Sequence, residues 1–302
     1  MYKKQIIRIA NILAINYQRL SSYGLVSGYL GIALFYFLYS RYIQSETHKK
    51  MAENILESII SHKNNKMPRT FSNGLYGLGW TLKYLIKNHY INADDNALRM
   101  FDAMASGLYS EVEYQHDLKD DFSTYSKGLY SSLLTKTDLQ NRTFKNLELY
   151  LNKFDITDMK LSYLISVLYF VLKYETNFKN KSKVYPVKRK LILLINQAIV
   201  FNNYTNQDLY ILSSFIVKFN INIELQSCKF DLIKDVLMNW QTVVYKDAVS
   251  VDYNIDAEYL DKIIAETNPR EYPRIISIER LCSLGINLIM GEMETRQNTD
   301  LQ

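Results

Sequence analysis

The segment "SNGLYGLGW", residues 72–80, repeats much of an earlier segment, "SGYLGIALF", residues 27–35. Placing Gly77 on Gly31 aligns the two segments at an offset of 46 residues. Glycine costs a helix roughly 1 kcal/mol relative to alanine, so glycines at the start of apolar helical patterns indicate a turn or a close approach of helices. Six of the ten glycines of the chain lie in or beside the two segments: Gly24, Gly28, Gly31, Gly74, Gly77 and Gly79.

Weaker copies of the same pattern follow along the chain. The segment "YSKGLYSSLL", residues 125–134, keeps the serine, glycine, leucine and tyrosine of the second copy. Near the end, "RLCSLGINLI", residues 280–289, sets Gly285 in the position of Gly31. Two apolar runs without glycine, Leu161–Leu172 and Leu209–Phe219, are spaced to fill the missing copies.

The period of about 50 residues is typical of a helical hairpin with its connections. Because strand signals are scarce, with Ala248–Ile255 as a short alternating exception, we predict an all-α fold of six to seven hairpins in one domain, 1–302. Such hairpins stack into an open solenoid or close into a ring, and glycines at the more apolar helices favour the ring. Helical faces are predicted at Met51, Ile55 and Ile59, at Leu98, Phe101, Ala105 and Leu108, and at Leu191, Leu194 and Ala198.

Composition and charge indicate a globular protein and argue against a dedicated nucleic-acid binder. The 302 residues are 48% hydrophobic and 22% charged, which is typical of a soluble globular protein. A net charge of +5 is small for a dedicated nucleic-acid binder. The stretch from Lys173 to Lys190 carries seven basic residues against Glu175, and we interpret it as a solvated loop between helices, with a patch for an anionic partner as the alternative.

The cysteine count and the N-terminal sequence indicate a cytoplasmic protein. Two cysteines, Cys228 and Cys282, make no disulfide framework, and the first residues show no signal-peptide cleavage site. The uncharged run Leu20–Ser40 is long enough to span a bilayer, which leaves membrane attachment as an alternative. Serines and tyrosines interrupt the run, and its second copy carries Lys83 and Lys87, so we favour a buried helix.

The repeated glycine segments resemble those of the lanthionine synthetase C-like (LanC-like) family. "GLVSGYLGIALFYFL", Gly24–Leu38, and "FSNGLYGLGWTLKYL", Phe71–Leu85, are similar to that family's Gly-Leu-x-x-Gly-x-x-Gly phrase and the apolar helix that follows it. The resemblance is clearest over residues 24–135 and closest to short bacterial members. It implies an α/α-toroid and a role in the modification of ribosomally made peptides.

The cyclases of that family use a zinc ion held by two cysteines and a histidine, in Trp-Cys-x-Gly and Cys-His-Gly phrases. Neither phrase is present, because Cys228 lies in "QSCKF" and Cys282 in "RLCSLG". We therefore assign no catalytic residue, no metal ligand and no cofactor, leave the binding residues open, and interpret both cysteines as small apolar helix residues. The four histidines all lie in the first part of the chain: His48, His62, His89 and His116.

Two acidic groups offer alternative metal sites. Asp94 and Asp95, with Asp102 on the same predicted helix, could bind magnesium, but helix capping is the favoured interpretation. The group formed by His116 with Asp117, Asp120 and Asp121 could hold a metal weakly, but the absence of glycine favours a solvated loop.

Tyrosines beside the glycine turns are the candidate binding residues. A phenol there offers contact area and a hydrogen bond to a peptide or small ligand, although core packing is the plainer interpretation. These tyrosines are Tyr23, Tyr29, Tyr76 and Tyr130.

These observations lead to one functional hypothesis and two alternatives. The hypothesis is a LanC-like pseudoenzyme that binds or guides a precursor peptide or a peptide-modifying enzyme, with no nucleic acid and no membrane as partner. The first alternative is an active cyclase, or another toroid enzyme, with an unrecognised metal site. The second is a protein attached to a membrane through Leu20–Ser40.

Overall fold

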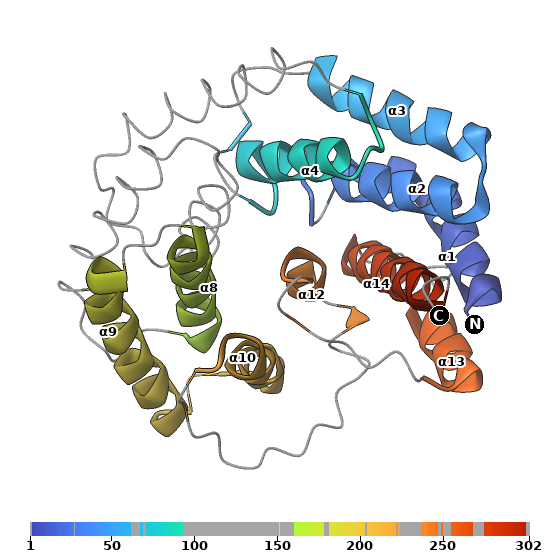
Figure 1. Cartoon of the computed structure of the whole chain (residues 1–302). Coiled ribbons are helices and arrows are strands. Elements are labelled where there is room, and N and C mark those ends of the chain that lie inside the picture. The colour runs from blue at the N-terminus through green and yellow to red at the C-terminus, as the bar shows by residue number, and fades with distance from the viewer. Residues whose placement is uncertain are drawn as a thin grey trace. The chain divides into compact units, whose positions relative to one another are not determined.

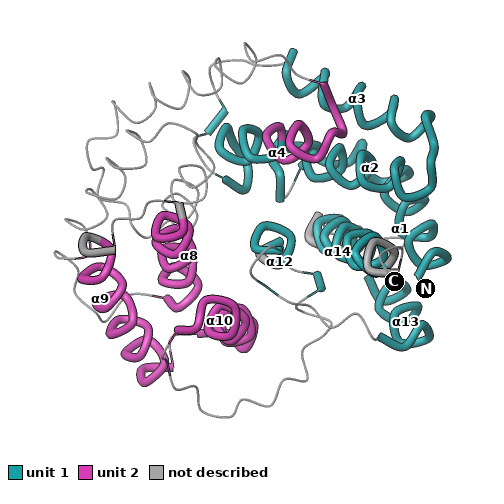
Figure 2. The backbone as a smooth tube through the Cα atoms, in the orientation of Figure 1, with its two compact units in different colours: residues 1–81, 231–302 teal, residues 82–230 magenta. Residues whose placement is uncertain are grey.

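Helices make up all the regular structure in the residues that the computed structural model describes, which confirms the all-α prediction for them. Figure 1 labels these helices along the chain. Contacts divide the chain into two compact units, residues 1–81 with 231–302, and residues 82–230 (Figure 2). A single domain over residues 1–302 stays a prediction. The described residues are 2–26, 28–61, 67–68, 71–92, 151, 160–177, 181–202, 204–221, 223, 237–238, 240–246, 249, 255–267 and 275–299.

The first unit joins helices from both ends of the sequence. From the N-terminal part come α1 (Lys3–Asn16), the short 3-10 helix η1 (Tyr17–Arg19), α2 (Tyr29–Ile43) and α3 (Glu46–Ser61). From the C-terminal part come α12 (Trp240–Val244), α13 (Ala257–Thr267) and α14 (Ile275–Thr299). Helix α4 (Leu75–Lys87) begins in the first unit and ends in the second.

Helices α2 and α14 form the centre of the first unit. Residues 30–40 of α2 and residues 281–292 of α14 are buried on every side, as expected of helices without a polar face. The two helices pack against each other, and α1 packs against α14. A Cβ atom on Gly285 would lie 2.5 Å from Cε2 of Phe35, so this glycine permits the close approach. Unlike Gly31, Gly285 lies deep inside its helix, so its match to the repeat does not extend to its place in the structure.

The two glycine segments fold into the same loop followed by a helix. Helix α2 begins at Tyr29 and α4 begins at Leu75, 46 residues later. The amide of Tyr29 donates to the carbonyl of Ser22 at 3.0 Å, and the amide of Leu75 donates to the carbonyl of Pro68, also at 3.0 Å. The same hydrogen bond therefore closes both loops at equivalent residues.

Glycine is required in the first turn of α2 and of α4, because the backbone of the preceding loop approaches each helix closely there. A Cβ atom on Gly31 would lie 2.3 Å from the carbonyl oxygen of Leu25, and one on Gly77 would lie 2.1 Å from that of Phe71. Each carbonyl belongs to the residue six positions before its glycine. No described glycine has a positive φ, so the structure selects close approach over a left-handed turn.

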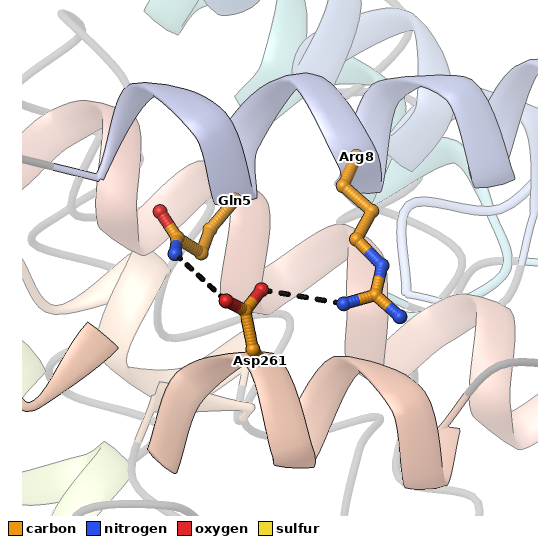
Figure 3. Close-up of polar contacts among 3 residues, drawn as sticks. All are labelled: Gln5, Arg8 and Asp261. Atoms are coloured by element: carbon orange, nitrogen blue, oxygen red, sulfur yellow. Dashed lines mark hydrogen bonds and ion pairs between the residues drawn. The ribbon is translucent and has the colours of Figure 1, made fainter. Parts of the chain in front are cut away.

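Polar contacts tie the first helix to the C-terminal part of this unit. Gln5 Nε2 donates to Asp261 Oδ2 at 3.3 Å, and Arg8 Nη1 pairs with Asp261 Oδ1 at 3.2 Å (Figure 3). Both sides of the ion pair are well exposed, so it adds little to stability. It does fix α13 beside α1, since the three side chains bridge the two helices.

The second unit contains α8 (Leu161–Asn177), α9 (Lys181–Val200) and α10 (Asn206–Phe219). Helix α8 packs against both α9 and α10. The two apolar runs without glycine, Leu161–Leu172 and Leu209–Phe219, lie in α8 and α10, so both are helical as predicted. Leu191, Leu194 and Ala198 are buried on one face of α9, which confirms that predicted face too.

The basic stretch was wrongly predicted to be a loop. Helix α9 begins at Lys181 and continues through Pro186, so most of that stretch is helical. Proline removes one backbone hydrogen bond from a helix. Burial of Val184, Val187 and Leu191 along one face favours the helix in spite of this loss.

The uncharged run Leu20–Ser40 is not one continuous helix, because α2 begins only at Tyr29. Within the described part of the chain, no helix has both the length and the hydrophobicity needed to cross a bilayer. The predicted helix at Leu98–Leu108 and the third glycine copy lie outside the described residues, as does most of Ala248–Ile255.

Candidate functional site

A groove in the first unit is the best candidate for a binding site. Its volume is about 560 Å³, within the range of small-molecule and side-chain pockets. One wall comes from η1, the first glycine loop and the start of α2, and the other wall is α3. The lining residues are Tyr17, Tyr23, Tyr29, Thr47, Lys50, Met51, Asn54, Ile55, Ser58 and Ile59.

Three tyrosines form the first wall. The ring of Tyr29 meets that of Tyr17 edge to face, with centroids 6.2 Å apart, and lies beside that of Tyr23 at 5.8 Å. The Tyr29 amide closes the first glycine loop on Ser22, so the repeated loop places this ring. Tyr23 is 37% exposed, which leaves much of its ring available to a bound molecule. Aromatic rings in such arrangements offer large, rigid contact area.

Helix α3 presents two parallel rows of side chains to the groove. Rows at helical spacing share one face of a helix. From Thr47 to Ile59 the helix rises about 18 Å at 1.5 Å per residue, so the groove is elongated. The polar row is Thr47, Lys50, Asn54 and Ser58, and the apolar row is Met51, Ile55 and Ile59.

An aromatic cluster behind the groove holds α3 against α2. His48 of α3 stacks on Tyr36, with ring centroids 6.0 Å apart, and meets Tyr39 edge to face at 5.0 Å. The Nδ1 atom of His48 lies 2.8 Å from the hydroxyl of Ser45. The Tyr36 hydroxyl donates to the carbonyl of Ala10 at 2.7 Å, and burial raises its pKa, so it stays a protonated donor. These contacts fix the α3 wall relative to the tyrosine wall.

Lys50 is the charged residue among the described lining residues. It forms no ion pair with another described residue. The neighbouring Lys49 instead lies 4.0 Å from Glu53, outside the groove. The described lining of the groove therefore carries a positive charge and no carboxylate.

The predicted tyrosines divide into two groups. Tyr23 and Tyr29 line the groove, whereas Tyr76 is 1% exposed and belongs to the core. Tyr130 lies outside the described residues. Tyr17 and most of the α3 wall were not predicted from the sequence, although Met51, Ile55 and Ile59 were predicted to share a face. The polar row at the same helical spacing was the signal that could have completed the site.

Cys282 is an interior residue of α14, as interpreted from the sequence. It is 2% exposed, and its thiol donates to the carbonyl of Gly31 at 3.2 Å. Burial, with a smaller contribution from Glu279, raises the pKa of the thiol, which disfavours the thiolate that metal binding requires. Cys228 lies outside the described residues.

The other candidate metal ligands are not brought together in the described residues. There, no group of three or more His, Cys, Asp or Glu side chains is placed to hold a metal ion. His48 belongs to the aromatic cluster, and His89 follows α4 with a φ of 56°. His62 and His116 lie outside the described residues. So do both acidic groups, the first formed by Asp94, Asp95 and Asp102 and the second by Asp117, Asp120 and Asp121.

Part of the basic stretch is engaged within the second unit. Lys188 lies 2.8 Å from Glu175, and Lys173 lies over the ring of Tyr169 at 5.4 Å from its centroid. These partners reduce the charge left for an anionic partner.

The groove has the chemistry of a binding site. It combines aromatic and aliphatic surface with hydroxyl, amide and ammonium groups. No protein-family model, curated protein or solved structure matches this chain.

Proposed function

We propose that this chain is a LanC-like protein that binds a peptide in the groove without cyclising it, as a binding or scaffolding member of a peptide-modification system. The observation that carries the proposal is the elongated groove along α3, whose opposite wall of tyrosines is placed by the first glycine loop. Its partner is a precursor peptide or an enzyme that modifies one.

The repeated loops support the family assignment. The glycine phrase that resembles the family's phrase occurs twice, and both copies share the closing hydrogen bond and the glycine packed on a carbonyl. We also propose the family's α/α-toroid for the whole chain. In its support, α1 and α14, from opposite ends of the sequence, pack together in one unit.

The dimensions of the groove favour a peptide over a compact small molecule. A length of about 18 Å accommodates about five residues of extended chain. The polar row from Thr47 to Ser58 offers hydrogen-bonding groups at intervals of one helical turn, suited to backbone carbonyls. The tyrosine rings and Met51 offer surface for apolar side chains.

Selection from a library of eight-residue peptides, followed by fluorescence anisotropy of the enriched sequences, tests this proposal. Replacing Tyr23 by Ala removes groove surface and should weaken binding by about tenfold, equivalent to about 1.4 kcal/mol. Tyr185→Ala is the matched control, because Tyr185 is 66% exposed and lies on α9, outside the groove. Absence of any enriched peptide, or equal losses in the two variants, would contradict the proposal.

A second assay separates binding from cyclisation. Cyclisation of a dehydrated precursor consumes its thiols, so the number of thiols that N-ethylmaleimide can alkylate falls. We expect that number to stay unchanged when the bound peptide is incubated with the protein. Loss of thiols that depends on the protein would establish cyclase activity instead.

A further inference from the structure

We infer that the groove selects peptides that carry a carboxylate next to aromatic or large apolar side chains. This inference rests on the proposed function, since it names the class of peptide that the same groove takes. The carboxylate binds Lys50, and the neighbouring side chain packs among Tyr17, Tyr23 and Tyr29.

The charge of the groove supports the first part of the inference, binding of a carboxylate. Lys50 projects from the groove wall without an ion pair to a described residue, so an incoming carboxylate displaces no internal partner. Thr47 and Asn54 stand three residues before and four residues after it, on the same face of α3. A hydroxyl, an ammonium and an amide on one face can together satisfy the oxygens of a single carboxylate.

The tyrosine wall supports the second part of the inference, binding of an aromatic or large apolar side chain. The ring of Tyr29 lies beside those of Tyr17 and Tyr23, and Tyr23 remains 37% exposed at the groove. The opposite wall at that face is apolar, from Met51 and Ile55. A side chain that enters between the walls meets hydrophobic surface on both sides, which favours Phe, Tyr, Leu or Met over small polar residues.

The single cation in the described lining of the groove favours a peptide over a nucleic acid as the ligand. Binding to a phosphate backbone depends on several Lys or Arg side chains along the contact. The described lining has one, surrounded by apolar and uncharged groups. One charged anchor beside a broad hydrophobic surface is suited to an acidic and aromatic segment of peptide.

Three fluorescein-labelled eight-residue peptides provide the test. The first alternates Phe and Glu, the second Phe and Lys, and the third Ser and Glu. By fluorescence anisotropy at moderate salt, we expect the Phe and Glu peptide to bind about tenfold more tightly than either of the others. The difference from the second peptide measures charge, and the difference from the third measures the aromatic contribution.

Charge reversal at Lys50 supplies the decisive variant. Lys50→Glu should weaken binding of the Phe and Glu peptide by about tenfold and strengthen binding of the Phe and Lys peptide. Lys49→Glu is the matched control, because it makes the same change one residue away and outside the groove, and should alter both affinities by less than about twofold. Circular dichroism of both variants checks that they are folded.

The outcomes separate this inference from the proposed function. Equal affinity for the acidic and basic peptides, or equal effects of the two lysine variants, would overturn the inference. Library peptides that bind and depend on Tyr23 would then still support the proposed function. Failure of the three peptides and of the whole library to bind would overturn both.

Discussion

The amide nitrogen of Val26 lies 2.9 Å from the carbonyl oxygen of Ser72, and these two residues occupy the same position in the two copies of the repeated segment. The copies therefore pair with each other through equivalent residues. Beside them, a Cβ atom on Gly24 would lie 2.4 Å from Cα of Asn73, so the two loops are in direct backbone contact. This pairing links the groove wall at Tyr29 to the start of α4.

Alanine at Gly31 or Gly77 should destabilise the protein to a similar extent. In each case the added methyl group meets a carbonyl oxygen of the backbone, which can move only if the whole loop moves. We expect a loss of about 2–3 kcal/mol in the free energy of unfolding for each variant, measured by urea denaturation. A loss below about 0.5 kcal/mol in both, the range of ordinary surface substitutions, would show that the loops are not constrained in this way.

The stability lost in Gly285→Ala should be partly recovered by a second substitution, unlike the stability lost in Gly77→Ala. The added methyl group meets the ring of Phe35, so Phe35→Leu in the same chain should recover part of the lost stability. The matched pair is Gly77→Ala with Leu25→Ala. There, trimming the side chain leaves the Phe71 carbonyl in place and should recover nothing. Equal recovery in the two pairs would contradict this distinction.

The carboxylate of Glu292 should make stability depend on acid pH. It accepts hydrogen bonds from the amide of Tyr2 and, at 3.2 Å, from the hydroxyl of Tyr42. Burial alone would raise the pKa of Glu292, but the positive amino terminus and these donors outweigh it and lower the pKa. Because the folded pKa lies below the unfolded value, the stabilisation is present at neutral pH and is lost as pH falls through the folded pKa.

Replacing Glu292 by Gln tests this linkage. At pH 7 we expect a loss of about 1–2 kcal/mol in the free energy of unfolding, since a charged acceptor is removed from a buried site. The difference from the wild type should shrink as pH falls below about 4.3, the ordinary pKa of a glutamic acid. Glu53→Gln, on the surface of α3, is the control that should show no such trend. A difference that is constant from pH 7 to pH 3 would refute the linkage.

The cap of α10 should contribute to the stability of the second unit. Thr205 and Asp208 form a capping box, in which Asp208 accepts from the Thr205 amide at 2.8 Å and Thr205 accepts from the Asp208 amide at 3.2 Å. Thr205→Ala should cost about 1 kcal/mol and speed hydrogen exchange in the first turn of α10. Unchanged exchange at Asp208 would argue against the cap.

Purified protein should contain no stoichiometric zinc, because Cys282 is held inside α14 with its thiol on the carbonyl of Gly31. Metal content per chain, measured by mass spectrometry without chelators, checks this expectation. A zinc ion that disappears in the Cys228→Ala, Cys282→Ala double variant would contradict it and restore cyclase chemistry on an unfamiliar ligand set.

Local patterns predicted the helices and the repeated loops, because glycine spacing and apolar periodicity are properties of the chain itself. The offset of 46 residues recurs in the hydrogen bonds at Tyr29 and Leu75. The basic stretch was misread because its run of positive charge suggested a solvated loop, whereas burial of Val184 and Val187 depends on tertiary packing. Gly285 matched the repeat in sequence, but its role depends on contact with Phe35 of α2, a helix far from it in the sequence, which no local pattern predicts.

The groove could be predicted only in part. Tyr23 and Tyr29 were marked by their places beside the first glycine loop. The role of Lys50 depends on which face of α3 meets α2, and the stacking of His48 on Tyr36 sets that face. Contacts of this kind join residues that no local pattern relates.

Photo-crosslinking tests the central claim, that a peptide occupies the groove along α3, most directly. p-Benzoylphenylalanine would replace Ser58 in the groove or, as a control, Ile15, which is 75% exposed on α1 outside the groove. With a library-selected peptide, we predict crosslinks from position 58, competed away by unlabelled peptide, and none above background from position 15. Equal crosslinking from both positions, or from position 15 alone, would contradict the account.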